Sequence, residues 1–307
     1  MPRALERLRL SATSPGDLMS YVTEAFANLK SALEITDTEQ ALASSRRQAI
    51  YDHLGDHWEI TTAFLTGSYD RHTKTKKLKD VDIFAVIDPE GAQSDLRQLG
   101  PTPVLVALKE VLEEKYPDRV TIDVLACVIT FGTEEILSFE VVPAYEHDAG
   151  GYEIPDTVSG VWIRTDPTKH AERTTAKNAA CDGKWVPFIK MVKGINREGG
   201  EPVQSFLLEV IGLDVVREPF GRYQDEIATY LASAADQIIN DWPDPAEVGP
   251  AVNRAMTAWE RSQAADQLRG WQRTAEQAID LEDAGNERAA VEKWRELFGN
   301  RMPRPNS

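Results

Sequence analysis

The sequence predicts an α+β protein in which a small mixed sheet, backed by helices, is followed by a helical lobe. Two observations lead to this fold class. Up to about residue 165, short segments rich in Val, Ile, Thr and Phe alternate with segments of helical apolar spacing. From about residue 166 onward, strand signals nearly vanish and helical segments follow one another. We therefore predict a core with N-terminal helices over residues 1–165 and a helical lobe over residues 166–307.

The elements of the core follow from helix-start signals and apolar periodicity. Ser14-Pro15 places a proline at the first position of a helix, and the apolar residues after it recur at intervals of three and four: Val22, Phe26, Leu29 and Leu33. Asp37-Thr38-Glu39 opens a second helix that runs to about Leu54. The remaining predicted elements of the core are strands at 60–66, 81–87 and 136–142, a helix at 103–115 and a β-rich stretch at 120–131.

The helical lobe begins at Thr165-Asp166-Pro167, which caps its first helix. Further helices are expected at 185–195 and 203–215. The segment 245–298 is rich in Ala, Glu, Gln and Arg and is broken at Gly285-Asn286, so it predicts a helical hairpin.

The most informative motif joins a Gly67-Ser68 turn, a basic connection and two aspartates, Asp80 and Asp82, that precede an apolar strand. Residues i and i+2 of a strand point to the same face, so Asp80 and Asp82 can hold one hard cation between them. Mg²⁺ prefers oxygen ligands and is completed by substrate phosphates, and the N–H groups and hydroxyl of the turn suit a phosphate. Together these features predict a nucleotidyltransferase site.

A third carboxylate is expected from a neighbouring strand, because two-metal phosphoryl transfer clamps both the attacking and the leaving oxygen. Glu140 is the only charged residue in the apolar segment 136–143. Asp123 lies in the strand-like segment 120–124, where a solvent-facing carboxylate is equally comfortable. The residues by themselves leave both candidates open.

The charge distribution favours a small polyphosphate over a nucleic acid. A net charge of −16 argues against strong nucleic-acid binding, since such binding depends on neutralising phosphates. Against that background, a basic island lies beside the proposed metal site and consists of Arg71, Lys74, Lys76, Lys77 and Lys79. No apolar run reaches membrane length and the first residues lack an apolar leader segment, so we expect a cytoplasmic protein without membrane association.

The motif Gly67-Ser68-Tyr69-x-Arg71-x-Thr73, followed by Asp80-Val81-Asp82, resembles the signature of the polymerase-β-like nucleotidyltransferases. Within that superfamily the chain is most similar to the bacterial CD-NTases, relatives of cyclic GMP-AMP synthase and oligoadenylate synthase. The resemblance continues in the order of the family through residues 139–144, 162–167, 190–196, 205–209 and 294–299. It implies that residues 1–165 form a polymerase-β-like nucleotidyltransferase core.

The resemblance also implies an activity. Such an enzyme condenses nucleoside triphosphates into a cyclic di- or oligonucleotide second messenger, releases pyrophosphate, and uses two Mg²⁺ ions, with Mn²⁺ as an alternative. A role in anti-phage defence, a downstream effector reached through the product, and a regulatory protein partner belong to the same expectation. Base preference, product size and the need for an activator stay open.

Two alternative functions remain. One is nucleotide transfer to an RNA or protein acceptor, and the acidic net charge disfavours an RNA acceptor. The other is a non-catalytic nucleotide sensor, which the presence of both Asp80 and Asp82 disfavours. No G-x-S-x-G elbow and no Walker A motif is present in the sequence, so neither a hydrolase triad nor a P-loop ATPase is predicted.

For the third acid, the resemblance favours Glu140 over Asp123, because that acid stands before a Val-Val-Pro-Ala type segment, although it is usually Asp in the family. Asp80, Asp82 and Glu140 are thus the predicted catalytic and metal-binding residues. The predicted phosphate-binding residues are Gly67, Ser68, Arg71, Lys193 and Ser205, the last two through the resemblance alone.

Overall fold

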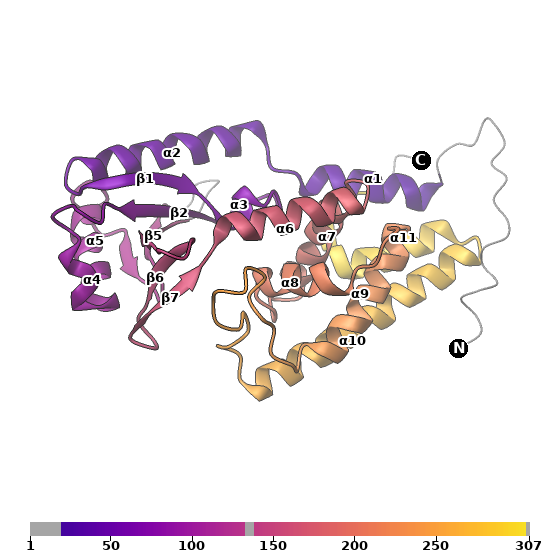
Figure 1. Cartoon of the computed structure of the whole chain (residues 1–307). Coiled ribbons are helices and arrows are strands. Elements are labelled where there is room, and N and C mark those ends of the chain that lie inside the picture. The colour runs from indigo at the N-terminus through magenta and orange to yellow at the C-terminus, as the bar shows by residue number, and fades with distance from the viewer. Residues whose placement is uncertain (1–19, 133–137, 305–307) are drawn as a thin grey trace.

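The computed structural model describes residues 20–132 and 138–304 and arranges them in two lobes (Figure 1). The sheet lobe contains α2 (Asp37–Gly55), β1 (Ile60–Leu65), α3 (Gly67–Asp70), β2 (Asp80–Ile87), α4 (Asp95–Leu99), α5 (Pro101–Lys115), β3 (Val120–Ile122), β4 (Cys127–Thr130), β5 (Ser138–Glu146), β6 (Tyr152–Asp156) and β7 (Val161–Thr165). The helical lobe contains α1 (Tyr21–Leu33), α6 (Pro167–Ala180), α7 (Trp185–Glu198), α8 (Ser205–Val215), α9 (Tyr223–Gln237), α10 (Ala258–Asp283), α11 (Glu287–Phe298) and the short 3₁₀ turn η1 (Gly299–Arg301). This arrangement confirms the predicted α+β fold.

The strands form one mixed sheet. Its order is β1-β2-β5-β4-β3, and β6 and β7 continue from β5 as a hairpin. β2 and β5 run parallel, whereas β1 with β2 and β4 with β5 are antiparallel. Every residue of β2 from Ile83 to Ile87 is buried, as expected for a central strand covered on both faces.

The two faces of the sheet meet different partners. On one face α2 and α5 pack against the strands, in a core that includes Ile50, Ile83 and Leu105. Phe84 of β2 points the opposite way, as strand periodicity requires, and joins a second cluster with Val142 of β5. This second face turns toward the helical lobe, and a cavity opens there.

The first helix, α1, packs with the helical lobe. The ring of Phe26 lies edge-on to Trp294, at 5.2 Å between centroids, and to Phe298, at 6.2 Å. Figure 1 shows α1 among the helices of that lobe, whereas α2 lies along the sheet. The Ser14-Pro15 signal lies outside the described residues. The division of the chain into two domains near residue 165 stays a prediction. By its packing, α1 belongs with the helices that follow residue 165.

The connection between α9 and α10 departs from the sequence-based expectation. The predicted hairpin over 245–298 is correct for α10 and α11, which meet at Gly285-Asn286, but it is wrong for residues 245–257, which are irregular. Three prolines between residues 243 and 250 explain the difference, since proline lacks the N–H that a helix interior needs. The irregular connection carries Asp244 to the cavity described below.

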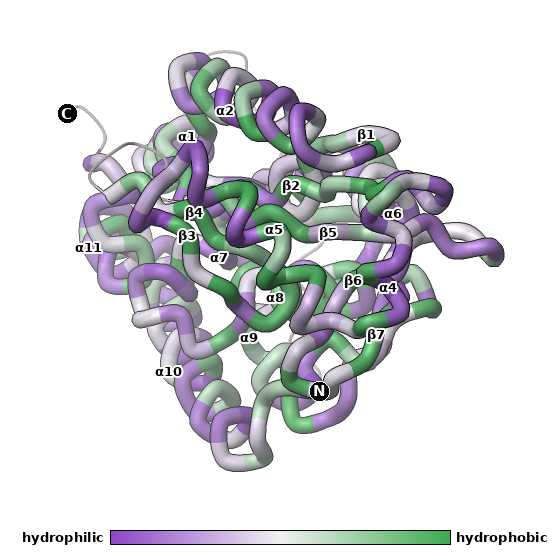
Figure 2. Tube along the Cα trace, turned by 90° about the vertical axis from the view of Figure 1, so that its left-hand side faces the viewer, coloured by the Kyte–Doolittle hydropathy of each residue, from purple (hydrophilic) through white to green (hydrophobic). Residues whose placement is uncertain are grey.

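The hydropathy pattern follows this architecture (Figure 2). Hydrophobic stretches run along β2, α5 and α8, whereas α10 is largely hydrophilic. The buried residues of α10 still recur at intervals of three and four, as Leu268, Trp271, Ala275 and Ile279, so one stripe of this helix faces the core. Within the described part of the chain, no helix combines the length and the hydrophobicity needed to cross a lipid bilayer.

Candidate active site

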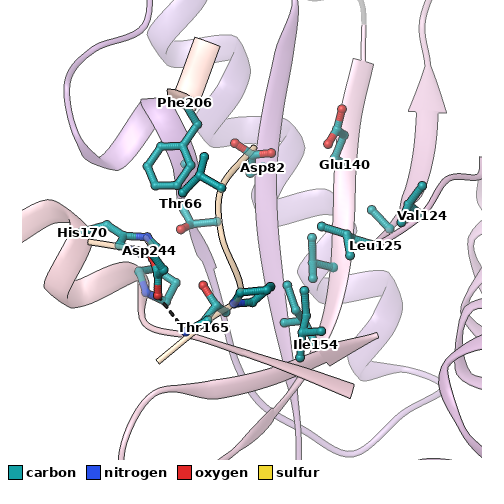
Figure 3. A pocket seen from close by; sticks show the side chains of 18 of the residues that line it. Thr66, Asp82, Val124, Leu125, Glu140, Ile154, Thr165, His170, Phe206 and Asp244 are labelled. Carbon is teal, nitrogen blue, oxygen red and sulfur yellow. Dashed lines mark hydrogen bonds and ion pairs between the residues drawn. The ribbon is translucent and has the colours of Figure 1, made fainter. Parts of the chain in front are cut away.

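Three carboxylates project from the stretch where β2 and β5 run side by side. Asp80 lies opposite Ser138, and Asp82 lies opposite Glu140. Paired residues of neighbouring strands point to the same face, so Glu140 lies beside Asp82, and Asp80 shares that face two residues earlier. Figure 3 shows Asp82 and Glu140 on adjacent strands beside one cavity, and Asp82 also lines a smaller one; these are called the larger and the smaller cavity from here on. The structure thus brings together the three residues predicted as metal ligands.

Burial and crowding raise the proton affinity of two of these carboxyl groups. Burial, and after it the charge of Asp80, raises the pKa of Asp82 to about 6. Burial, and after it the charges of Asp82 and Asp80, raises the pKa of Glu140 to about 7. Like charges held this close disfavour each other's ionised form, and a cation between them would reverse the effect.

The turn between β1 and α3 is pressed against β2. Gly67 has a φ of +62°, and a Cβ at this position would lie 1.7 Å from Oδ2 of Asp82. The N–H of Thr66 donates to the carbonyl oxygen of Asp82 at 3.0 Å. Beyond the turn, the carbonyl of Ser68 accepts from the N–H groups of Thr73 and Lys74, at 3.0 and 3.1 Å. The loop therefore folds back on itself beside the carboxylates.

A buried ion network joins this loop to the helical lobe. Glu209 of α8 accepts from Nε of Arg71 at 2.8 Å and from Nζ of Lys193 at 2.6 Å. Lys193, on α7, also donates to the carbonyl and hydroxyl oxygens of Thr73, both at 3.2 Å. Burial alone would raise the pKa of Glu209, but the two cations and their hydrogen bonds hold it at about 2. The network carries one net positive charge and fixes both lobes around the carboxylates.

The predicted phosphate-binding residues gather around the smaller cavity, of about 150 Å³. Ser68, Lys193 and Ser205, the first residue of α8, line it together with Asp80 and Asp82. Arg71 lines both cavities, and Gly67 lines the larger one.

The sequence did not single out Arg197 and Glu201, which also line the smaller cavity. Glu201 holds Lys79 of the basic island at 2.6 Å and approaches Nε of Arg197 at 3.6 Å. Much of the positive charge predicted for phosphate binding is therefore already paired with carboxylates of the helical lobe.

The larger cavity, of about 520 Å³, lies between the two lobes (Figure 3). Its sheet side is apolar and includes Phe84, Val142 and Ile154, and its helical side includes Phe206. The guanidinium of Arg71 lies 4.5 Å from the ring centroid of Phe206. An apolar wall facing an aromatic ring suits a flat heteroaromatic group such as a nucleobase.

A histidine–aspartate pair closes the helical side of this cavity. Nε2 of His170, on α6, lies 2.5 Å from Oδ1 of Asp244, and Oδ2 of Asp244 accepts from the N–H of Gly249 at 2.9 Å. Sequence reasoning missed this pair because the partners are 74 positions apart and neither belongs to a local motif. The Pro-Asp-Pro pattern at 243–245 marks a loop but not its destination.

The alternative third acid, Asp123, also lines the larger cavity. It follows the end of β3 and is exposed, and its N–H donates to the carbonyl of Ala126 at 2.9 Å. Glu140, by contrast, stands within β5 in register with Asp82. Glu140 is thus the candidate that the register sets opposite Asp82, and its role as the third ligand stays a prediction.

The fold is shared with solved bacterial CD-NTases. The chain belongs to the family described as the Second Messenger Oligonucleotide or Dinucleotide Synthetase domain, whose model matches residues 19–178. Members of this family synthesise cyclic oligonucleotides from nucleoside triphosphates, and this chain is a nucleotidyltransferase of that kind. The resemblance to the bacterial CD-NTases is thereby confirmed.

Individual relatives agree with this membership. A cyclic AMP-AMP-AMP synthase of Acinetobacter sp. (strain ATCC 27244 / 9458) is 27% identical, over 92% of this chain and 86% of the relative. The Bradyrhizobium diazoefficiens CD-NTase CdnG, solved with GTP, matches with a TM-score of 0.73 at 14% identity, over 92% of this chain and 97% of that one. CdnC of E. coli MS115-1, solved in a complex with HORMA-deltaN, matches with a TM-score of 0.71 at 15% identity, over 91% of this chain and 97% of that one. These solved structures share the fold.

Proposed function

We propose that the synthetase chemistry takes place at Asp80, Asp82 and Glu140, and that the product is a cyclic di- or oligonucleotide. The observation that carries this proposal is the register of β2 and β5, which sets Asp82 opposite Glu140 and beside Gly67. Because one relative is a cyclic AMP-AMP-AMP synthase, ATP is the first triphosphate to test.

Two Mg²⁺ ions, with Mn²⁺ as an alternative, fit the residues present. All three side chains offer only carboxylate oxygens, the donor type that Mg²⁺ prefers. Only a residue without a Cβ lets the carboxylate of Asp82 lie this close to the turn, because a Cβ at Gly67 would lie 1.7 Å from Oδ2. Asp80, Asp82 and Glu140 would hold the ions, and substrate phosphates would complete their coordination. When bound, such ions neutralise phosphate charge and stabilise the attacking and leaving oxygens.

The smaller cavity suits the triphosphate of the donor nucleotide. Ser68 and Ser205 offer hydroxyl donors on opposite lobes, and Ser205 stands at the N-terminal end of α8, where helix N–H groups favour an anion. The net positive charge of the network formed by Arg71, Lys193 and Glu209 adds to this attraction. Positive charge and donors at fixed positions orient a polyphosphate without base selectivity.

The bond-forming step follows from this placement. A ribose hydroxyl oxygen of the acceptor nucleotide attacks the α-phosphorus of the donor. The bond from that phosphorus to the bridging oxygen breaks, and pyrophosphate leaves with the electron pair. The hydroxyl proton passes to a carboxylate beside the attacking oxygen, and Glu140, which lines the larger cavity, would take this role.

The larger cavity would hold the nucleobases. Its volume of about 520 Å³ lies within the common range of small-molecule sites, roughly 300–1,000 Å³. Polar groups on its helical side, including Gln204 and the pair of His170 with Asp244, can hydrogen-bond base edges. Base preference would therefore be set by the helical lobe, while the sheet lobe supplies the chemistry.

We further propose a cytoplasmic role in anti-phage signalling, in which the product reaches a downstream effector. Family membership supports this role, because second messengers act through receptors that bind them. CdnC was solved with a HORMA protein, which makes a regulatory protein partner a reasonable object of search for this chain as well.

Product analysis tests the proposed function. The purified chain is incubated with each labelled nucleoside triphosphate, singly and in pairs, with Mg²⁺ or Mn²⁺, and the products are identified by mass. We expect a phosphatase-resistant cyclic product that disappears in Asp80→Asn/Asp82→Asn. Wild-type activity in that variant would overturn the site. Label on the ends of added tRNA or on protein, with no small cyclic product, would instead support transfer to a macromolecular acceptor.

A further inference from the structure

A second cluster of potential metal-binding side chains lies on α2 and α5, the helices that cover the sheet on the side away from the two cavities. It consists of His53 and His57 on α2 and Glu114 on α5. One ligand atom from each residue lies within 4.8 Å of the other two. None of these residues takes part in the nucleotide site proposed above.

The spacing of the cluster matches that of ligands on one metal ion. His53 and His57 are four positions apart on α2 and therefore share a face of the helix, with ring centroids 4.8 Å apart. Nε2 of His57 lies 3.3 Å from Oε2 of Glu114. Zinc bonds of about 2.0–2.2 Å at tetrahedral angles place neighbouring ligand atoms about 3.4 Å apart. The pair of His57 with Glu114 is thus already at that separation.

A hydrogen bond prepares His53 for coordination. Its Nε2 lies 2.7 Å from the carbonyl oxygen of Val111, on α5. A carbonyl oxygen can only accept, so the neutral ring carries its proton on Nε2 and keeps a free lone pair on Nδ1. Metal-bound histidines typically donate their second N–H to a backbone carbonyl or carboxylate, which fixes tautomer and ring orientation. Val111 supplies that support here.

We propose that His53, His57 and Glu114 bind one divalent transition-metal ion of the zinc type, with water completing the coordination. Two imidazoles and one carboxylate suit zinc, whereas the all-carboxylate set at Asp80 and Asp82 suits magnesium. His57 and Glu114 keep 33% and 59% of their side-chain surface exposed, so the ion can enter from solvent.

The ion would tie α2 to α5 and so support the catalytic strand. At its other end, α2 carries Glu39, whose Oε1 accepts from the N–H of Leu78 at 3.0 Å. Leu78 lies two residues before Asp80, the first residue of β2. A bound ion therefore stabilises the helix that anchors the loop leading into the nucleotide site.

The test is equilibrium dialysis of the full-length Asp80→Asn/Asp82→Asn chain against ZnCl₂, with the thermal midpoint measured in parallel. That background removes competing carboxylates, so we expect one zinc per chain and a rise in Tm. His57→Gln and Glu114→Gln should weaken zinc binding by at least about tenfold, because each removes one of three protein ligands. His147→Gln is the matched control, since His147 pairs with Glu153 at 3.9 Å outside the cluster.

A second readout separates the site from loose surface binding. Co²⁺ bound at a site of low coordination number absorbs strongly in the visible range, and this absorption should appear in the parent chain and in His147→Gln but not in His57→Gln. Absence of stoichiometric zinc in the parent chain would overturn the proposal. Equal zinc retention by His57→Gln and His147→Gln would overturn it as well.

Discussion

A Cβ atom on Gly67 would lie 1.7 Å from Oδ2 of Asp82, so the turn and the carboxylate are in direct contact. The hydrogen bond from Thr66 to the carbonyl of Asp82, at 3.0 Å, holds the same two segments together through their backbones. The turn at Gly67 and the carboxylate of Asp82 are therefore packed directly against each other.

This contact predicts that Gly67→Ala abolishes nucleotide transfer. The added methyl must displace the Asp82 carboxylate, and a non-glycine residue at a φ of +62° costs a further strain of about 1–2 kcal/mol. The matched control is Gly160→Ala, since Gly160 has a φ of +72° but an added Cβ there would meet no described atom within 4 Å. Turnover and Tm are measured for both variants. Activity in Gly67→Ala as high as in Gly160→Ala would show that the contact with Asp82 is not needed.

The raised pKa values of Asp82 and Glu140 predict that the metal-free protein loses stability as pH rises. Their pKa values, about 6 and about 7, exceed the ordinary values of 3.8 and 4.5. Each group therefore contributes stability that is present below about pH 4 and is lost as pH rises through the folded-state pKa. Each tenfold step in proton affinity corresponds to about 1.4 kcal/mol, so the effect of each group grows with the size of its pKa shift. Glu209, with its lowered pKa, acts with the opposite sign, and its contribution disappears only as pH falls through about 2.

Thermal melts between about pH 4.5 and 8 check this expectation in the absence and presence of Mg²⁺. Tm should fall with pH in the metal-free wild type, and Mg²⁺ should restore it. In Asp80→Asn/Asp82→Asn the fall should be smaller, because the buried Asp82 carboxyl group is gone and the pKa of Glu140 is then raised by burial without the added charges of Asp82 and Asp80. A metal-free wild type whose Tm rises over this range would contradict the assignment.

The register of β2 and β5 predicts that Glu140→Gln lowers the rate by several orders of magnitude, whereas Asp123→Asn is nearly silent. Both changes remove one carboxylate charge from the lining of the larger cavity, so each controls for the other. Glu140 faces Asp82 directly, but Asp123 lies beyond the end of β3. Single-turnover rates at saturating substrate decide between them, and the reverse ranking would place the third ligand on Asp123.

Much of the sheet lobe and of the carboxylate site could be predicted because the relevant signals are local. The Gly67-Ser68 turn, Asp80 with Asp82, and Glu140 alone in an apolar strand are all visible within short windows. Parallel pairing of β2 with β5 is not visible in this way, since it depends on which strands become neighbours. Placement of Glu140 beside Asp82 consequently needed the structure.

The parts that escaped prediction depend on contacts between distant segments. Nothing near His170 points to Asp244, and the spacing of apolar residues in α1 indicates a buried face without saying that α11 covers it. The hairpin of β6 and β7 lacks a clear strand signal, because Tyr152–Asp156 contains a proline and Val161–Thr165 an arginine among apolar residues. The positions of glycine and proline predict where the chain turns, but they do not predict how the two lobes pack against each other.

Lys193→Ala and Ser205→Ala should separate phosphate binding from structural support. Lys193→Ala leaves Glu209 with Arg71 as a remaining partner, so we expect a loss of stability of about 2–3 kcal/mol, less than for a fully orphaned buried charge. Ser205 is exposed at the start of α8, so Ser205→Ala should leave Tm nearly unchanged and raise KM for the triphosphate. Both variants should make the same product as the wild type. A changed product would mean that these side chains contact bases.

The carboxylate of Glu201 predicts competition with incoming phosphate. Glu201 pairs with Lys79 at 2.6 Å and approaches Arg197 at 3.6 Å, and all three side chains line the smaller cavity with Asp80. Glu201→Gln removes one negative charge there and frees both cations for phosphate. Since exposed ion pairs contribute at most about 1 kcal/mol, KM for the triphosphate should fall by about two- to fivefold with kcat unchanged.

The matched control is Glu198→Gln, because Glu198, the last residue of α7, lies three positions before Glu201 but pairs with Arg301 at 2.6 Å instead of a residue of the smaller cavity. Steady-state kinetics of both variants are measured at low salt and again near 0.5 M salt, where the screening length falls to only a few ångström, roughly 4 Å. The advantage of Glu201→Gln should shrink at high salt, because the freed cations act through long-range attraction. An unchanged or higher KM in Glu201→Gln at low salt would show that Glu201 positions Lys79 and Arg197 for the substrate and does not compete with it.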